Sequence, residues 1–202
     1  ALAGMEKDMK VVAISSAMDD EGKTAVACNL AAALATTRRV LLLDADLRRP
    51  SVSAAMGLPP GTPGLVQLLT RRASLDQCIK SVRSSPLRVL PAGRAASNAL
   101  DLLMSSRFDK LIAELKKHFD TIIIDCPPVQ LVSDTLVLGR AASSMIFVAR
   151  SDSTPLQVTR RALHRIDKAG IPVLGVALNA HDFAQADRFY GESSGYGHDY
   201  AY

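Results

Sequence analysis

Three short segments carry side chains that bind phosphate and metal ions. The first, residues 14–24, ends in Gly22-Lys23-Thr24, where a strand-like run leads into an alanine-rich helical pattern. A glycine, an ammonium group and a hydroxyl group in this context are typical of a P-loop. Backbone N–H groups at the helix start bind phosphate oxygens, while Lys23 reaches the terminal phosphates and Thr24 contacts Mg²⁺. We expect ATP with Mg²⁺ at this loop, with contacts from Asp20, Glu21, Gly22, Lys23, Thr24 and Ala25.

The other two segments are apolar runs that end in carboxylates. Residues 40–50 read VLLLDADLRRP and carry Asp44 and Asp46, whereas residues 121–128 read TIIIDCPP and carry Asp125. Alternation along an extended chain predicts that Asp44 and Asp46 point to the same side, and paired like charges favour a bound cation. Each acid could instead cap a turn. The order of the three segments favours a site in which Thr24, Asp44 and Asp125 hold Mg²⁺.

Strand and helix patterns alternate around these segments, which predicts an α/β fold with a mainly parallel central sheet and helices on both faces. In such sheets, ligands bind at the carboxyl ends of the strands. The expected strands are 11–15, 40–43, 88–90, 121–124, 145–149 and 173–178, and the expected helices are 23–36, 64–69, 75–82, 105–118, 135–142 and 156–169. Residues 51–63 and 91–98 are rich in Gly, Pro, Ser and Ala, and we expect them to be loops.

Length and composition limit the remaining possibilities. A chain of 202 residues with 48% apolar residues suits one domain, here 1–180, and a net charge of +4 without a basic block does not indicate nucleic acid. The cysteines are widely spaced and odd in number, so neither disulfides nor zinc are indicated. No apolar run approaches the ~20 residues that cross a bilayer, so we expect a soluble chain. It opens on Ala1, which suggests a piece of a longer polypeptide.

The last segment, 181–202, differs from the rest in composition. Gly, Ser, Asp and Tyr replace the aliphatic residues, and we expect a flexible tail without a core of its own. All four tyrosines of the chain lie here, whereas structural tyrosines are usually packed in a core. We interpret Tyr190, Tyr196, Tyr200 and Tyr202 as phosphate acceptors; the alternative is a tail that is merely flexible or adhesive.

The order GKT, LLLDADLRRP, IIIDCPP and a tyrosine cluster resembles the bacterial tyrosine kinases of capsule and exopolysaccharide synthesis over nearly the whole chain. The resemblance implies a P-loop NTPase fold and an autokinase that phosphorylates the tail of a neighbouring subunit. It assigns catalysis to Lys23, Asp44, Asp46 and Asp125, and an adenine contact to Asn179, which could equally form a turn. It also implies a membrane-embedded co-polymerase activator, a tyrosine phosphatase, and a place at the cytoplasmic face of the inner membrane.

The loop departs from the family pattern in ways that bear on ATP binding. Ala17 occupies the position of the first glycine in the P-loop pattern. Where the family commonly has Pro-Gly-Glu-Gly-Lys, this chain has Asp19-Asp20-Glu21-Gly22-Lys23. Asp20 replaces a glycine that can adopt positive φ, and three carboxylates stand beside a polyanion site. We predict weaker ATP affinity than for a standard loop, unless Mg²⁺ or an arginine compensates. In the family, a helix with an oligomerisation motif precedes the first strand; if this piece was cut after that helix, we expect it to assemble poorly.

Two other functions share the same fold and remain as alternatives. A MinD-like or ParA-like ATPase switch carries a lysine five residues before the P-loop lysine, where this chain has Met18. A weakly catalytic, ATP-responsive scaffold of the export machinery is compatible with the altered loop. Arg48 and Arg49 would contact phosphate, a neighbouring subunit or solvent, and the basic residues of 160–168 form an exposed helix face or, less favoured, a membrane or subunit contact.

Overall fold

The computed structural model describes residues 10–83, 85–151 and 153–180. Seven strands form one sheet in the order β3-β4-β2-β5-β1-β6-β7, and only the β3–β4 pair is antiparallel. The strands are β1 (Val11–Ser16), β2 (Val40–Asp44), β3 (Lys80–Ser81), β4 (Arg88–Leu90), β5 (Thr121–Asp125), β6 (Ser144–Arg150) and β7 (Val173–Asn179). The predicted mainly parallel sheet is confirmed.

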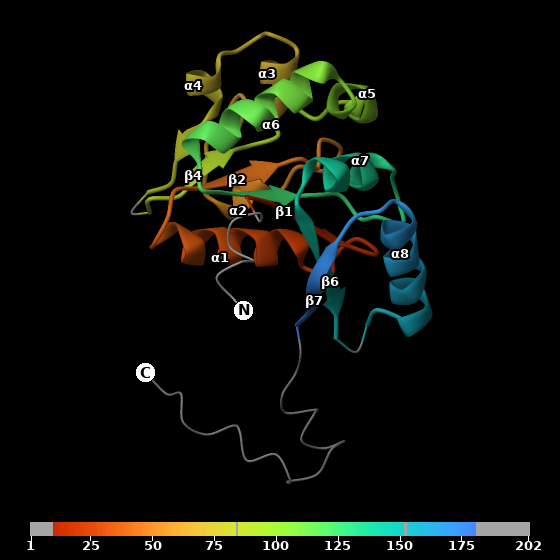
Figure 1. Cartoon of the computed structure of the whole chain (residues 1–202). Coiled ribbons are helices and arrows are strands. Elements are labelled where there is room, and N and C mark those ends of the chain that lie inside the picture. The colour runs from red at the N-terminus through yellow and green to blue at the C-terminus, as the bar shows by residue number, and fades with distance from the viewer. Residues whose placement is uncertain (1–9, 84, 152, 181–202) are drawn as a thin grey trace, which may run out of the picture.

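Helices cover both faces of the sheet, as Figure 1 shows, with α1 and α2 on one face and the larger group on the other. The long helices are α1 (Lys23–Ala35), α6 (Ser106–His118), α7 (Asp134–Ala141) and α8 (Leu156–Lys168). Short helices are α2 (Val52–Ala55), α3 (Leu65–Leu69), α4 (Leu75–Cys78) and α5 (Ala99–Leu103). The fold is therefore the three-layer P-loop NTPase sandwich expected from the sequence.

The uninterrupted apolar runs are explained by burial on both sides. In β5, Ile122 and Ile124 pack in the core beneath α6 and α7, whereas Ile123 packs in the core beneath α1. Strand side chains alternate between faces, so a strand covered on both sides needs no polar alternation. α1 offers alanines at its buried positions, including Ala27 and Ala31, which lets its backbone approach the sheet closely.

Three local predictions were wrong. The expected loop 51–63 contains α2, a single turn whose first N–H, at Val52, is held by Asp44. The expected helix 75–82 stops at Cys78, because Ile79 turns extended and β3 then pairs with β4. α5 was not predicted at all. These elements have only two to five residues, too few to show a helical or strand period.

The remaining predictions concern the division of the chain, membrane-spanning segments and the cysteines. Residues 181–202 lie outside the described residues, so the division of the chain at residue 180 stays a prediction. Within the described parts, no helix is both long and apolar enough to span a bilayer, and the three cysteines are free and buried.

Candidate active site

The site begins with the strand order, which places β2, β5 and β1 next to one another. In the register of β2 with β5, Asp44 lies directly opposite Asp125. Both residues end their strands and both are fully buried. β1 lies on the other side of β5 and leads into the P-loop. The two acidic segments and the phosphate-binding loop therefore meet at the carboxyl edge of the sheet, as predicted.

The start of α1 faces this edge with its backbone donors available. Gly22 precedes the helix in a left-handed conformation (φ 87°), and no side chain caps the first turn. The first N–H groups of a helix have no partner within the helix, and the helix dipole adds positive charge there. Together with Lys23, whose Nζ lies 3.5 Å from Asp46 Oδ2, this end of α1 is suited to hold phosphate.

Thr24 connects the loop with the acid of β5. Its hydroxyl donates to Asp125 Oδ2 at 2.7 Å, and its oxygen lies 2.9 Å from Ser51 Oγ. The other oxygen, Asp125 Oδ1, is buried without a hydrogen-bond partner. A buried, unpartnered carboxylate oxygen beside a threonine hydroxyl and a second acid, Asp44, offers the oxygen ligands that Mg²⁺ prefers. Ser51 was not predicted, because it follows a proline in a segment without any motif.

The protein supplies only part of a metal coordination shell. Across the described parts of the chain, no three His, Cys, Asp or Glu side chains are grouped to hold an ion by themselves. Mg²⁺ in nucleotide sites uses one or two protein ligands and completes its shell with phosphate oxygens and water. The donors present fit Mg²⁺ bound together with a nucleotide.

Asp44 and Asp125 retain their protons more strongly than ordinary carboxyl groups do. Burial, followed by the charge of Asp125, raises the pKa of Asp44 to about 8. Burial also raises the pKa of Asp125 to about 6, against the hydrogen bond from Thr24 and the charge of Lys23, which lower it. Two adjacent acids that resist ionisation together are suited to a divalent cation, which would stabilise their charged forms.

Asp46 lies in the same site, but β2 ends at Asp44 and strand alternation no longer decides where Asp46 points. Its Oδ1 accepts a hydrogen bond from the N–H of Arg49 at 3.0 Å, and its Oδ2 faces Lys23. Asp44 is held by the N–H groups of Asp46 and Val52. The turn after β2 thus fixes both carboxylates.

The three loop acids, predicted to crowd the phosphates, have separate roles. Asp19 pairs with Arg49 (Oδ2 to Nη1, 2.9 Å), so an arginine is present to offset it. Glu21 is buried; its carboxylate accepts from the N–H of Met18 at 2.7 Å and from the Thr154 hydroxyl. Asp20 has φ 60°, which confirms that this position needs a left-handed residue. Glu21 therefore ties the loop to the segment before α8.

Asn179, at the end of β7, lies directly beneath the P-loop. Its Nδ2 donates to the carbonyl oxygen of Glu21 at 3.0 Å. The positive φ of Gly22 favours glycine, and a Cβ there would lie 1.9 Å from the same nitrogen, so that the Asn179 amide would have to move away from the loop. The adenine contact expected of Asn179 stays a prediction; the structure adds a role in supporting the loop.

Arg48 forms an ion pair that the sequence did not reveal. Its Nε lies 2.8 Å from Asp134 Oδ2, where Asp134 is 1% exposed and begins α7. This pair connects the acidic segment after β2 with α7, and it removes Arg48 from the set of free phosphate ligands. The expected phosphate acceptors Tyr190, Tyr196, Tyr200 and Tyr202 lie outside the described residues.

A family model described as an AAA domain matches residues 9–169. Tyrosine-protein kinase YwqD of Bacillus subtilis is 32% identical over 93% of this chain and 79% of its own length. Tyrosine-protein kinase wzc of Salmonella typhimurium is 34% identical over 88% of this chain. The chain spans only a quarter of that relative, 25% of its length.

Solved structures agree with these relatives. The VpsO kinase domain superposes with a TM-score of 0.85 at 37% identity, covering 90% of this chain and 89% of its own. MinD of Pyrococcus horikoshii, complexed with Mg-ADP, has a TM-score of 0.71 at 27% identity and covers 84% and 69%. Similarity to MinD extends to the nucleotide-binding fold, whereas similarity to the kinases is greater in both sequence and structure. The chain belongs to the bacterial tyrosine-protein kinases, a family built on the AAA-type P-loop domain.

Proposed function

We propose that this chain is an ATP-dependent tyrosine autokinase that phosphorylates the 181–202 segment of a neighbouring copy. The observation that carries the proposal is the meeting of Lys23, Thr24 and the acids Asp44 and Asp125 at one edge of the sheet. A site with these groups binds Mg·ATP and neutralises phosphate charge, which is most of what phosphoryl transfer requires. The tyrosines concentrated in one segment supply the acceptor.

In the proposed reaction, Thr24, Asp44 and Asp125 would hold Mg²⁺, which would neutralise negative charge on the phosphates. Lys23 and the N–H groups at the start of α1 bind the same phosphates. Asp46 is the remaining carboxylate, and it lies beside Lys23. We assign Asp46 to orient the incoming tyrosine hydroxyl and accept its proton. The tyrosine oxygen then forms the new bond to the γ-phosphorus, the bond to the bridging oxygen breaks, and ADP leaves.

The cellular setting is proposed from the family resemblance. The chain would act at the cytoplasmic face of the inner membrane, together with a membrane-embedded polysaccharide co-polymerase and a tyrosine phosphatase that reverses the modification. Self-association follows from phosphorylation between copies. Co-purification with a membrane fraction that contains the co-polymerase, lost when that protein is deleted, is the test of this placement.

Incubation of the purified chain with ATP and Mg²⁺, followed by mass spectrometry, tests the activity. We expect phosphate on the four tail tyrosines, and none in Lys23→Met, which removes the phosphate-binding ammonium group. Mixing Lys23→Met as acceptor with an active chain that lacks the tail tyrosines tests transfer between copies. ATP hydrolysis without any tyrosine phosphorylation, at concentrations where copies associate, would refute the kinase and favour the MinD-like switch.

A further inference from the structure

A pocket lies at the edge of the sheet opposite the P-loop, where the parallel strands begin. It has a volume of about 310 Å³ and is lined by Arg38, Arg39, Val40, Ile79, Pro86, Arg88 and Phe119. Apart from Ile79, which precedes β3, these residues stand at or just before the starts of β2, β4 and β5, whereas Asp44 and Asp125 stand at the ends of β2 and β5. With a rise of about 3.3 Å per residue, the length of β2 separates the two sites by about 13 Å.

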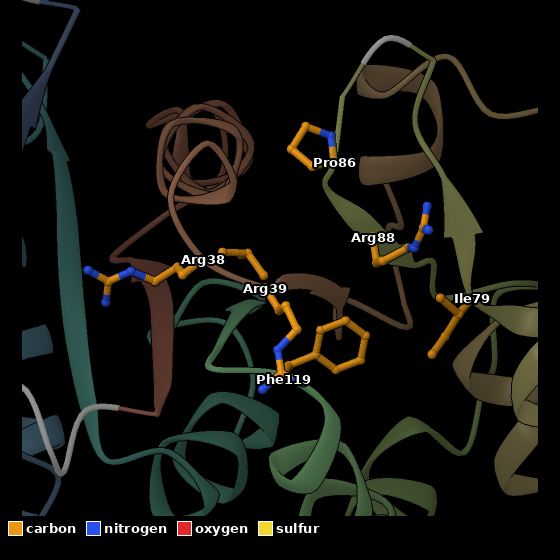
Figure 2. Close-up of a pocket in the computed structure, with 7 residues that line it drawn as sticks. Arg38, Arg39, Ile79, Pro86, Arg88 and Phe119 are labelled. Atoms are coloured by element: carbon orange, nitrogen blue, oxygen red, sulfur yellow. The ribbon is translucent and has the colours of Figure 1, made fainter.

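The pocket has an apolar floor and a cationic rim. Ile79 and Phe119 are partly buried members of the core beneath α6, and Val40 is fully buried. Figure 2 shows Arg38 and Arg39 on one side of the opening and Pro86 and Arg88 on the other, and the guanidinium ends of Arg38 and Arg88 both point away from the opening into the flanking surface. A ligand that suits this shape has an apolar or aromatic body and negative charges beside it.

The charges at the rim are only partly compensated. Arg39 forms a bidentate pair with Asp120, with 2.6 Å between Nη2 and Oδ1. Arg88 donates to the Ser81 hydroxyl. Within the described residues, the guanidinium of Arg38 has neither a hydrogen bond nor an ion pair. The carboxylate of Glu114, on α6 before Phe119, pairs with Lys117 and His118. Two exposed guanidinium groups therefore remain for an acidic partner.

The chain itself contains a segment with the complementary composition. Residues 181–202 carry four acids and one arginine, a net charge of −3, while residues 1–180 carry +7. The same 22 residues hold six of the nine aromatic side chains of the protein, including Phe183 and Phe189. Each phenylalanine has an acid nearby, Asp182 or Asp187. Aromatic side chains flanked by carboxylates match an apolar pocket rimmed by arginines.

We propose that the acidic, aromatic segment 181–202 docks on this pocket, with a phenylalanine ring on its apolar floor and carboxylates at Arg38 and Arg88. The segment follows Ala180 on the P-loop edge, since Asn179 contacts Glu21. Twenty-two residues extend over at most about 70 Å, enough to reach the far edge of the same copy or of a neighbour. The docking needs no phosphoryl transfer, so it can be tested independently of the kinase activity.

Photo-crosslinking in the full-length chain locates the segment. Phe189 is replaced by benzoyl-phenylalanine, the protein is irradiated, and the crosslinked peptides are mapped by mass spectrometry. We expect crosslinks to peptides that contain Ile79, Pro86 or Phe119. Mixing isotopically light and heavy copies shows whether the contact is within one chain or between two. Crosslinks that map elsewhere, or spread evenly over the surface, would overturn the proposal.

Charge reversal tests the rim. Arg38→Glu combined with Arg88→Glu should lower the yield of the specific crosslink about tenfold, which corresponds to about 1.4 kcal/mol. Both residues are exposed, so the fold should survive, and circular dichroism checks this. Arg160→Glu with Arg161→Glu, on the exposed face of α8, changes the net charge equally and should leave the yield unchanged. An equal loss in both double variants would reduce the effect to general charge attraction and reject a specific site.

Discussion

Replacing Asp44 by asparagine should stabilise the nucleotide-free protein at neutral and alkaline pH. The side chain is fully buried, and burial with the charge of Asp125 raises its pKa to about 8. The folded protein therefore holds this proton more tightly than the unfolded chain, whose aspartates titrate near ~3.9. Raising the pH from about 4 to about 8 then weakens the fold by about 1.4 kcal/mol per pH unit. Asparagine has no charge to bury and escapes this loss.

The magnitude follows from two opposing contributions. The folded protein keeps Asp44 largely protonated while the unfolded chain ionises it, which costs the wild-type fold about 5 kcal/mol at pH 7.5 and about 1–2 kcal/mol at pH 5. Asp44 accepts hydrogen bonds from the N–H groups of Val52 and Asp46. An amide nitrogen cannot accept one of them, which costs the variant about 1–2 kcal/mol. We expect a net gain of about 3 kcal/mol at pH 7.5 and about zero at pH 5.

Thermal unfolding followed by circular dichroism in EDTA measures this difference. At about 2–4 °C per kcal/mol for a domain of this size, Asp44→Asn should raise Tm by about 6–12 °C at pH 7.5 and leave it nearly unchanged at pH 5. Asp167→Asn, on the exposed surface of α8, is the matched control and should shift Tm little at either pH. A variant no more stable than wild type at pH 7.5, or a shift equal at both pH values, would refute the reasoning.

Three further changes have clear expected results. Asp20→Gly removes a left-handed aspartate (φ 60°) and a charge, so it should bind ATP more tightly in a fluorescence titration; unchanged affinity would show that the aspartate costs nothing. Gly22→Ala should weaken ATP binding in the same titration, because alanine is strained at φ 87° and its Cβ would displace the Asn179 side chain from the loop. Arg48→Met leaves buried Asp134 without its cation and should lower the free energy of unfolding by about 3 kcal/mol in urea; a loss below about 1 kcal/mol would mean that the pair is not structural.

The larger elements of the fold could be predicted because their signals are local. The runs before Asp44 and Asp125 are apolar throughout, as in strands covered on both faces, and α1 begins at Lys23 as the P-loop pattern requires. The positive φ of Asp20 was also expected, since glycine is usual at that position. Short elements such as α2 could not be predicted, because one helical turn shows no period. α2 also depends on a hydrogen bond from Val52 to Asp44 at the end of β2.

What the sequence determined by itself is the chemistry available: an ammonium group, a threonine hydroxyl and three carboxylates at the ends of strands, with the tyrosines gathered in one segment. Only the tertiary structure decided which groups meet. Asp44 faces Asp125 because β2 and β5 are neighbours although 81 residues separate them in the chain. Glu21 stabilises the loop, because its carboxylate accepts a hydrogen bond from Thr154 in the segment before α8. Such contacts depend on strand order and packing, which no local pattern encodes.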